Sequence, residues 1–347
     1  MKKLIYFILA ITLIGCSSAP KQNLPPKFTF SYSEYFSWSI FGVAGNYGLI
    51  DPEEGKLGEV EKKWNVDIVL VQSDYDTCIT QYASGVTDGT CLTTLDALSP
   101  SLGRSSLAVC PTSTSSGADA CVVTGINNID ELKNHKTYGL AKSVSQYVFV
   151  RNLVKMGKDP KDYQFESMDP AVASQAMQTN QNGVSSIMVW QPFILETLNK
   201  RSESKVLFDS KELKEEVIDC IILSKDSVNK EGGERFACAI IDTFYQMNQK
   251  LLDPNLRDKT LVLIGTKFSS LGLNEMKTIS TQTLLYKTPE EGVSLFDKES
   301  YQNTIMPLVA SFCVDQGLVP KTEKLFDFDK NQAPLTFTTK YMKKVSQ

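Results

Sequence analysis

The side chains with the most evident binding chemistry lie in the stretch Ala141-Lys-Ser-Val-Ser-Gln-Tyr147. An apolar strand is predicted just before it, at 137–140, and an amphipathic helix after it. Ser143, Ser145 and Gln146 therefore stand where a helix begins. The free N–H groups and positive dipole end of a helix start favour an anion. The alternative is that one of the serines is only the N-cap of the helix.

Further polar and aromatic side chains follow other predicted strands. In α/β proteins, ligands bind outside the carboxyl ends of parallel strands, beside the starts of the next helices. The candidates at such ends are Ser33, Glu34, Tyr35 and Trp38 after the strand 27–32, Thr93 and Thr94 after 89–93, Thr112 and Ser113 after 106–110, and Trp190 and Gln191 after 185–189. Together with Ser143, Ser145 and Gln146 they form the predicted ligand-binding set.

Each candidate also has a purely structural alternative. The aromatic candidates Tyr35, Trp38 and Trp190 also suit a hydrophobic core. Glu34 also suits a solvated loop, and the two threonines after strand 89–93 can cap a helix as readily as they bind a ligand.

The class of ligand stays open. The helix start at Ser143 favours an anion, whereas Glu34 close to aromatic residues favours an aromatic or amine-bearing solute. Arginine is the usual bidentate clamp for a carboxylate, and none occurs in the candidate loops. Receptors for amino acids are therefore disfavoured. A sulfonate, a nitrate-like anion and a heterocyclic vitamin precursor remain.

No enzyme constellation is evident in the sequence. It contains no G-x-S-x-G elbow, no P-loop and no G-x-G-x-x-G. The single histidine, His135, lies in a polar Lys-Asn-His-Lys run, which disfavours Ser-His or Cys-His catalysis. None of the eight cysteines belongs to a C-x-x-C pair, so neither a metal site nor a cofactor is expected. Cys110 and Cys121 flank a turn-rich segment and either form a disulfide or stay buried thiols.

Residues 1–16 have the pattern of a secretion signal. Lys2 and Lys3 precede an apolar run, Leu4–Ile14, that is too short to span a bilayer. The run ends in Leu-Ile-Gly-Cys16, which resembles the lipobox of bacterial lipoproteins and implies lipidation of Cys16. Residues 17–26 would then be a flexible tether. We expect a lipid anchor on a bacterial membrane, in the periplasm or at the cell surface; the alternative is an ordinary signal peptide with a chance cysteine.

Length and composition narrow the possible classes of protein. A chain of 347 residues predicts two domains, and 42% hydrophobic residues are typical of a globular protein. A net charge of −4 without a long basic run disfavours nucleic acid as a partner. Strands and helices alternate over 27–223, which predicts an α/β fold with largely parallel sheets. From Gly233 to about residue 316 the pattern is mainly helical.

Five short motifs resemble, in order, those of the type II substrate-binding proteins of ABC importers, in particular the nitrate, sulfonate, taurine and thiamine-precursor receptors. They are Phe41–Ile50, like the family's A…GLF helix; Tyr82–Gly89, like its L..G..D element; Ser116–Asp119, like its GAD turn; Ile129–Leu140, like dLkGk.vgv; and Gly183–Phe193, like G.vDA...WeP. The sequence departs from the family at Ser185 or Ser186, where Asp is usual, and at Asn134-His135, where Gly is frequent. Gln191 also replaces the common Glu.

The resemblance implies a two-lobed type II periplasmic-binding-protein fold, with two mixed, mostly parallel sheets joined by hinge crossover strands. Lobe one would comprise 27–112 plus 224–347, and lobe two 113–223. It implies a monomer, not an enzyme, that captures a small organic or anionic solute between the lobes and presents it to ABC permease and ATPase subunits. Two alternatives stay open: an enzyme of the thiamine-pyrimidine-synthase type, and a sensory or structural lipoprotein that keeps the cleft.

Overall fold

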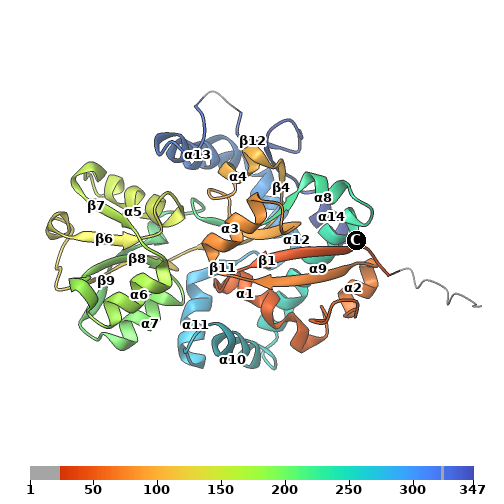
Figure 1. The fold of residues 1–347 in the computed structure, drawn as a ribbon, viewed down its shortest axis with the longest axis horizontal. Coiled ribbons are helices and arrows are strands. Elements are labelled where there is room, and N and C mark those ends of the chain that lie inside the picture. The colour runs from red at the N-terminus through yellow and green to blue at the C-terminus, as the bar shows by residue number, and fades with distance from the viewer. Residues whose placement is uncertain (1–23, 322–323) are drawn as a thin grey trace, which may run out of the picture.

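Two β-sheets, each covered by helices, form separate lobes in a computed structural model of the chain (Figure 1). The structure describes residues 24–321 and 324–347. The predicted signal 1–16, the lipidation candidate Cys16 and most of the tether 17–26 lie outside the described residues. Within the described part, no helix is both long enough and apolar enough to cross a membrane.

The larger sheet has eight strands in the order β12-β13-β4-β10-β3-β1-β2, with β11 paired to β4. β1 pairs in parallel with β2 and β3, whereas β10 runs antiparallel to both β3 and β4. The sheet is therefore mixed. Its strands are β1 (Lys27–Tyr32), β2 (Asp67–Gln72), β3 (Gly89–Thr93), β4 (Ser106–Ser115), β10 (Ile218–Ser224), β11 (Thr283–Leu285), β12 (Phe326–Phe328) and β13 (Leu335–Phe337).

The smaller sheet has five strands in the order β7-β6-β8-β5-β9. β6 pairs in parallel with β7 and β8, and β5 runs antiparallel to β8 and β9. Its strands are β5 (Asp119–Thr124), β6 (Lys136–Gly139), β7 (Gln164–Ser167), β8 (Ser186–Trp190) and β9 (Ser204–Asp209).

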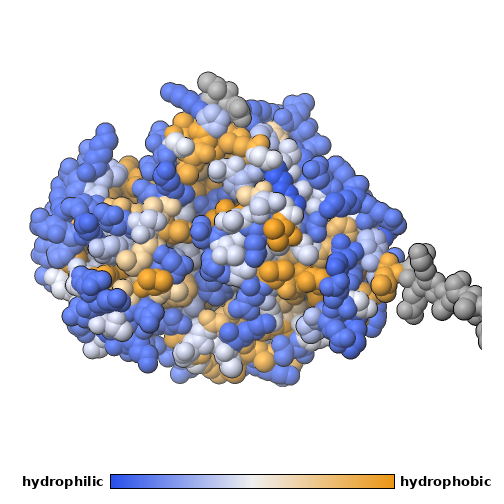
Figure 2. Space-filling view, in the orientation of Figure 1, coloured by the Kyte–Doolittle hydropathy of each residue, from blue (hydrophilic) through white to orange (hydrophobic). Residues whose placement is uncertain are grey.

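Helices cover both sheets. We call the larger sheet with its helices lobe one, and the smaller sheet with α5, α6 and α7 lobe two (Figure 1). The helices are α1 (Phe36–Val43), α2 (Glu59–Trp64), α3 (Tyr75–Ala83), α4 (Leu98–Gly103), α5 (Val144–Lys155), α6 (Pro170–Gln178), α7 (Phe193–Lys200), α8 (Lys225–Asn229), α9 (Gly233–Leu252), α10 (Arg257–Phe268), α11 (Leu273–Gln282), α12 (Pro289–Asp297), α13 (Met306–Asp315) and α14 (Lys340–Val345). Hydrophilic residues cover most of the visible surface of both lobes (Figure 2).

Helix α9 forms much of the core of lobe one. Most of its side chains are buried, and the ring of Phe236 stacks on that of Phe28 in β1, with centroids 4.6 Å apart. Burial of such rings is the main stabilising contribution that this helix makes.

Strands β4 and β10 carry the chain from lobe one to lobe two and back. Both remain paired in the larger sheet, β4 as far as Ser115 and β10 from Ile218 onward. The predicted lobe two, 113–223, is therefore too long at both ends. The sheet of lobe one contains residues 113–115 and 218–223. The chain crosses between the lobes at 115–119 and again just before Ile218.

The predicted fold class is confirmed, and two local predictions need correction. The segment after Gly233 was expected to be helical, but it contains the edge strand β11, which completes the sheet beside β4. Asp74 caps α3 and accepts a 2.9 Å hydrogen bond from the backbone N–H of Thr77. Strand β4 is also longer than its apolar stretch, because its polar half pairs with β10 and β11. The seven described cysteines are all buried free thiols.

Candidate functional site

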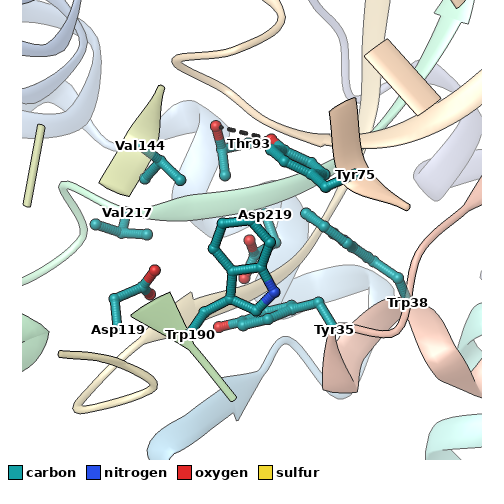
Figure 3. Close-up of a pocket in the computed structure, with 9 residues that line it drawn as sticks. All are labelled: Tyr35, Trp38, Tyr75, Thr93, Asp119, Val144, Trp190, Val217 and Asp219. Atoms are coloured by element: carbon teal, nitrogen blue, oxygen red, sulfur yellow. Dashed lines mark hydrogen bonds between the residues drawn. The ribbon is translucent and has the colours of Figure 1, made fainter. Parts of the chain in front are cut away.

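A small cavity lies where the two lobes meet (Figure 3). The space open to the centre of a water molecule is about 10 Å³, which is roughly the least that holds one water. The lobes are thus closed on each other. The lining residues are Tyr35, Trp38, Tyr75, Thr93 and Asp219 from lobe one, Asp119, Val144 and Trp190 from lobe two, and Val217 from the crossing segment.

Four aromatic rings form most of the cavity wall. Trp38 and Tyr75 are stacked, with centroids 5.3 Å apart and planes 15° from parallel. Tyr35 lies 5.0 Å from Trp38, and Trp190 meets Tyr75 edge to face at 5.5 Å. The Thr112 hydroxyl accepts a 3.2 Å hydrogen bond from the indole nitrogen of Trp38 and so fixes that ring. Trp190 comes from lobe two and the other three rings from lobe one, so closure completes the wall (Figure 3).

Two buried carboxylates face the same cavity. Asp119 is in β5, paired with Trp190 of β8, and Asp219 is in β10, paired with Thr93 and Ser113. The Ser113 hydroxyl donates a hydrogen bond to Asp219. Burial raises the pKa of Asp119 to about 6, and burial together with the nearby Asp119 raises the pKa of Asp219 well above its usual range. Among the described residues, no lysine or arginine forms an ion pair with either carboxylate.

The hydroxyl of Tyr35 is a third polar group at the cavity. Its oxygen is buried and has no hydrogen-bond partner among the described residues. Burial, followed by the charges of Asp219 and Asp119, raises the pKa of this phenol well above its usual range. A buried polar atom without a partner costs free energy unless something else bonds to it.

A carboxylate from lobe one occupies the start of helix α5. One oxygen of Asp96 accepts hydrogen bonds from the Tyr75 hydroxyl at 2.8 Å, the Thr93 hydroxyl at 2.9 Å and the backbone N–H of Val144 at 3.3 Å. Val144 is the first residue of α5, in lobe two. Burial raises the pKa of Asp96 to about 6 in spite of these bonds. A carboxylate of the protein itself therefore lies at the helix start where the sequence favoured an anionic ligand.

The hydroxyl and amide side chains predicted at this helix start have structural partners. Ser143 is the N-cap: its hydroxyl accepts from the Ser145 N–H at 3.1 Å and donates to the Leu140 carbonyl at 2.7 Å. Ser145 is buried, and its hydroxyl lacks a partner among the described residues. The Gln146 amide donates to Gln316 of lobe one at 3.3 Å. None of these three side chains lines the cavity, whereas Val144 does.

Glu34 and Gln191 lie beside the cavity and join the lobes. The Trp190 indole nitrogen donates to Glu34 at 2.8 Å, and the Gln191 amide donates to Gln282 at 2.8 Å. Both residues line a neighbouring small pocket, not the aromatic one. Burial raises the pKa of Glu34, although the Trp190 bond opposes the shift.

Some of the predicted residues line the cavity, and others hold the lining residues in place. Tyr35, Trp38, Thr93 and Trp190 line the cavity, and Thr112 and Ser113 position residues that do. Ser33 and Thr94 are buried near the strand ends but do not reach it. The roles of these residues in ligand binding stay predictions.

Sequence reasoning missed the carboxylates and one aromatic residue of the cavity. A signal was present for Asp219, because a lone carboxylate in an otherwise apolar strand requires a reason to be buried. Asp119 was noticed only as the end of the Ser116–Asp119 motif. Tyr75 and Asp96 carried no local signal, since their positions depend on contacts between distant segments.

Comparisons with known proteins rest on structure alone. No family model matches the chain, and no curated protein sequence matches it. Among solved structures, the alkanesulfonate-binding protein SsuA from Xanthomonas axonopodis pv. citri, bound to MOPS, has a TM-score of 0.67 at 16% identity. That match covers 86% of this chain and 95% of the other. The chain has the periplasmic-binding-protein fold.

Two further structures show the same fold. The periplasmic nitrate-binding protein NrtA from Synechocystis PCC 6803 has a TM-score of 0.62 at 12% identity, over 87% of this chain and 85% of the other. A Candida albicans protein described as having the generic periplasmic binding protein fold has a TM-score of 0.60 at 15% identity, over 86% and 93%. The resemblance seen in the sequence is thus confirmed for the fold. In this chain the cavity lies between the two lobes, as the predicted architecture requires.

Within the described residues, no group of three or more His, Cys, Asp or Glu side chains is arranged to hold a metal ion.

Proposed function

We propose that this protein is the extracytoplasmic solute-binding component of an ABC importer, which captures a small solute between its lobes and presents it to permease and ATPase subunits. The observation that carries the proposal is a cavity whose wall is completed only when the two lobes meet. Trp190 of lobe two and Tyr75 of lobe one touch edge to face across it. Structural neighbours that bind sulfonate and nitrate support the general role.

Closure is held by side chains that reach across the lobe boundary. Trp190 bonds to Glu34, Gln191 to Gln282 and Gln146 to Gln316. All three contacts break if the lobes rotate apart about the crossing segments of β4 and β10. A solute that bonds to both lobes would favour the closed form, which a permease can then distinguish from the open form.

The test is a thermal-unfolding screen of the purified protein, followed by small-angle X-ray scattering. A solute that binds the native state raises the melting temperature by mass action. It also decreases the radius of gyration if it stabilises closure. A screen of small cations, neutral compounds and anions that changes neither quantity contradicts the proposal.

We also propose that Cys16 carries a lipid that anchors the protein to a bacterial membrane. Incorporation of a labelled fatty acid into wild type and its loss in Cys16→Ala would support this. Ser17→Ala is the matched control and should label normally. Equal labelling of the Cys16→Ala variant contradicts the anchor but leaves solute binding intact.

The alternative of an enzyme on this scaffold depended on His135. In the structure its imidazole Nδ1 lies 3.0 Å from the Ser185 hydroxyl, and neither residue lines the cavity. Turnover of a bound pyrimidine that is lost in His135→Ala would favour the enzyme over the receptor.

A further inference from the structure

We propose that the interlobe cavity selects a small organic cation with N–H donors, held by the carboxylates of Asp119 and Asp219 against the aromatic wall. The inference rests on the proposed solute-binding function and names its solute class. It differs from the sulfonate and nitrate that the titles of the structural neighbours mention.

The charges at the cavity are all of one sign. Asp119 and Asp219 come from different lobes, and both are almost fully buried, at 3% and 2% exposure. Aromatic, hydroxyl and aliphatic side chains make up the rest of the lining, with no lysine or arginine among the described residues that form it. Burial without a countercharge makes the ionised form of each carboxyl costly, and a bound cation supplies the charge that offsets this cost.

Hydrogen-bond acceptors converge on the same space. The buried Tyr35 hydroxyl lines the cavity and has no partner among the described residues. In Figure 3 the Tyr35 oxygen lies just below the Trp190 ring and points toward the side on which the Asp119 carboxylate lies, to the left of that ring. An ammonium or amidinium group has several N–H donors and can bond to a carboxylate and a phenol oxygen together.

The aromatic wall adds a second attraction for a cation. Trp38 and Trp190 border the cavity on either hand of Tyr75, with ring centroids 5.3 and 5.5 Å from that of Tyr75. The negative faces of such rings attract organic cations, most strongly where water is excluded. The same rings give a flat amine a surface on which to stack.

An anion has no comparable site. The helix start that would receive it already donates the backbone N–H of Val144 to the Asp96 carboxylate from the opposite lobe. An entering anion would also lie close to two further carboxylates.

The solute must be small. The closed cavity has room for about one water, so the lobes open to admit a solute and the walls shift to hold it. A cation with one ring or a short alkyl chain fits this limit better than a polyamine or a nucleotide.

The experiment compares compounds of similar shape and different charge by calorimetry on the purified full-length protein. Benzylamine, benzyl alcohol and benzoate share a ring and differ mainly in charge. Benzyltrimethylammonium keeps the charge but has no N–H donors. We expect benzylamine to bind tightest, benzyltrimethylammonium more weakly, and the other two not measurably. Ethylamine and 4-aminopyridine extend the cationic class, and nitrate extends the anionic class.

Variants connect binding to the cavity carboxylates. Asp119→Asn and Asp219→Asn should each weaken benzylamine binding by about 10- to 100-fold, the usual effect of losing a hydrogen bond to a charged group. The control is Asp242→Asn, because Asp242 is a buried carboxylate that bonds to Lys63 and Trp64 far from the cavity. Circular dichroism establishes that each variant is folded, and Trp190→Ala gives an independent change in the wall.

Three results overturn the inference. They are no binding by any of the amines, equal binding by wild type and both Asn variants, and tight binding of benzoate or nitrate that improves in the Asn variants. The third result leaves the proposed receptor function in place. The transport role fails separately. It is rejected if cells with and without the gene take up the bound amine equally, in which case the assignment of the cavity still stands.

Discussion

The indole nitrogen of Trp190 donates a 2.8 Å hydrogen bond to the carboxylate of Glu34. The first residue ends β8 in lobe two, and the second follows β1 in lobe one, so this bond exists only when the lobes are closed. The same indole ring forms part of the cavity wall. One side chain therefore both contacts the solute space and holds the lobes together.

Trp190→Phe should shift the protein toward the open form. The change keeps most of the ring but removes the interlobe bond, which is worth about 1 kcal/mol and so a several-fold change in population. Scattering should give a larger radius of gyration than for wild type without added solute.

Trp64→Phe is the matched control for this change. Its indole donates a 2.8 Å bond to Asp242, but both residues belong to lobe one. The radius should stay at the wild-type value. An identical radius for Trp190→Phe would mean that the Glu34 bond does not hold the lobes.

Asp96→Ala should destabilise the protein. It leaves the Tyr75 and Thr93 hydroxyls and the Val144 N–H without their acceptor, at a cost of about 2 to 4 kcal/mol. Urea unfolding measures the loss. Asp76→Ala, which removes an exposed carboxylate in the first turn of α3, should change the midpoint much less. An equal decrease in stability in the two variants would show that the hydrogen bonds to Asp96 contribute no more than an exposed carboxylate does.

The stability of the protein should depend on the ionisation of Asp119. Burial raises the pKa of its carboxyl from 3.8 to about 6. The carboxylate of Asp219, the phenol of Tyr35 and the more distant Asp96 face it. The folded protein binds the Asp119 proton more tightly than the unfolded chain does. The protonated carboxyl therefore contributes its full stabilisation of the folded state below about pH 4, and this contribution is lost as the pH rises through about 6.

Asp119→Asn removes this titration and tests its sign. Asparagine resembles the protonated carboxyl, so the variant should exceed wild type in unfolding free energy by about 1 to 3 kcal/mol at pH 7. The difference should shrink toward pH 4. The exposed Asp226→Asn serves as the control, with a pH profile parallel to wild type. A constant difference between Asp119→Asn and wild type across this range would contradict the assignment.

Arg151 ties helix α5 to the segment that leads into β10. Its guanidinium donates to both oxygens of Glu216, at 2.7 and 3.1 Å, and the Tyr147 hydroxyl donates to the same carboxylate at 2.6 Å. Burial opposes ionisation of Glu216, but the bonds from Arg151 and Tyr147 outweigh it and lower the pKa.

Arg151→Met should therefore reduce the unfolding free energy by about 1.5 to 3 kcal/mol at pH 7. Because the pKa of Glu216 is lowered in the folded state, wild type should lose this advantage as the pH falls below about 4. Lys56→Met, which breaks an exposed pair with Glu53, should have little effect at either pH. An equal decrease in unfolding free energy in both variants would mean that the Arg151–Glu216 pair stabilises the fold no more than an exposed pair does.

Much of the fold was accessible from the sequence because its signals are local. The strand at 27–32 alternates in polarity, and the stretch 144–155 has helical spacing with a serine cap, and both form as predicted. Strand β11 was missed because three residues leave no periodic pattern and pair only with the distant β4.

The site was less accessible than the fold. Tyr35, Trp38 and Trp190 were found from their places beside strand ends, and they line the cavity. Asp119, Asp219 and Asp96 were not found, because the sequence alone does not distinguish a buried aspartate from a solvated one. Only the packing of the two lobes determines that these three are desolvated.

In the closed form, the Asp96 carboxylate of lobe one already occupies the start of α5 in lobe two, so this helix start needs no dissolved anion. Asp96 is tethered to the partner lobe, so its effective concentration at the helix start is in the millimolar range or above. A dissolved anion can bind at the helix start only if it displaces Asp96 at that effective concentration. Exchanging chloride for phosphate or sulfate at constant ionic strength should therefore leave the balance between open and closed forms unchanged, and the cleft can respond to a rare solute without interference from the abundant ions around it.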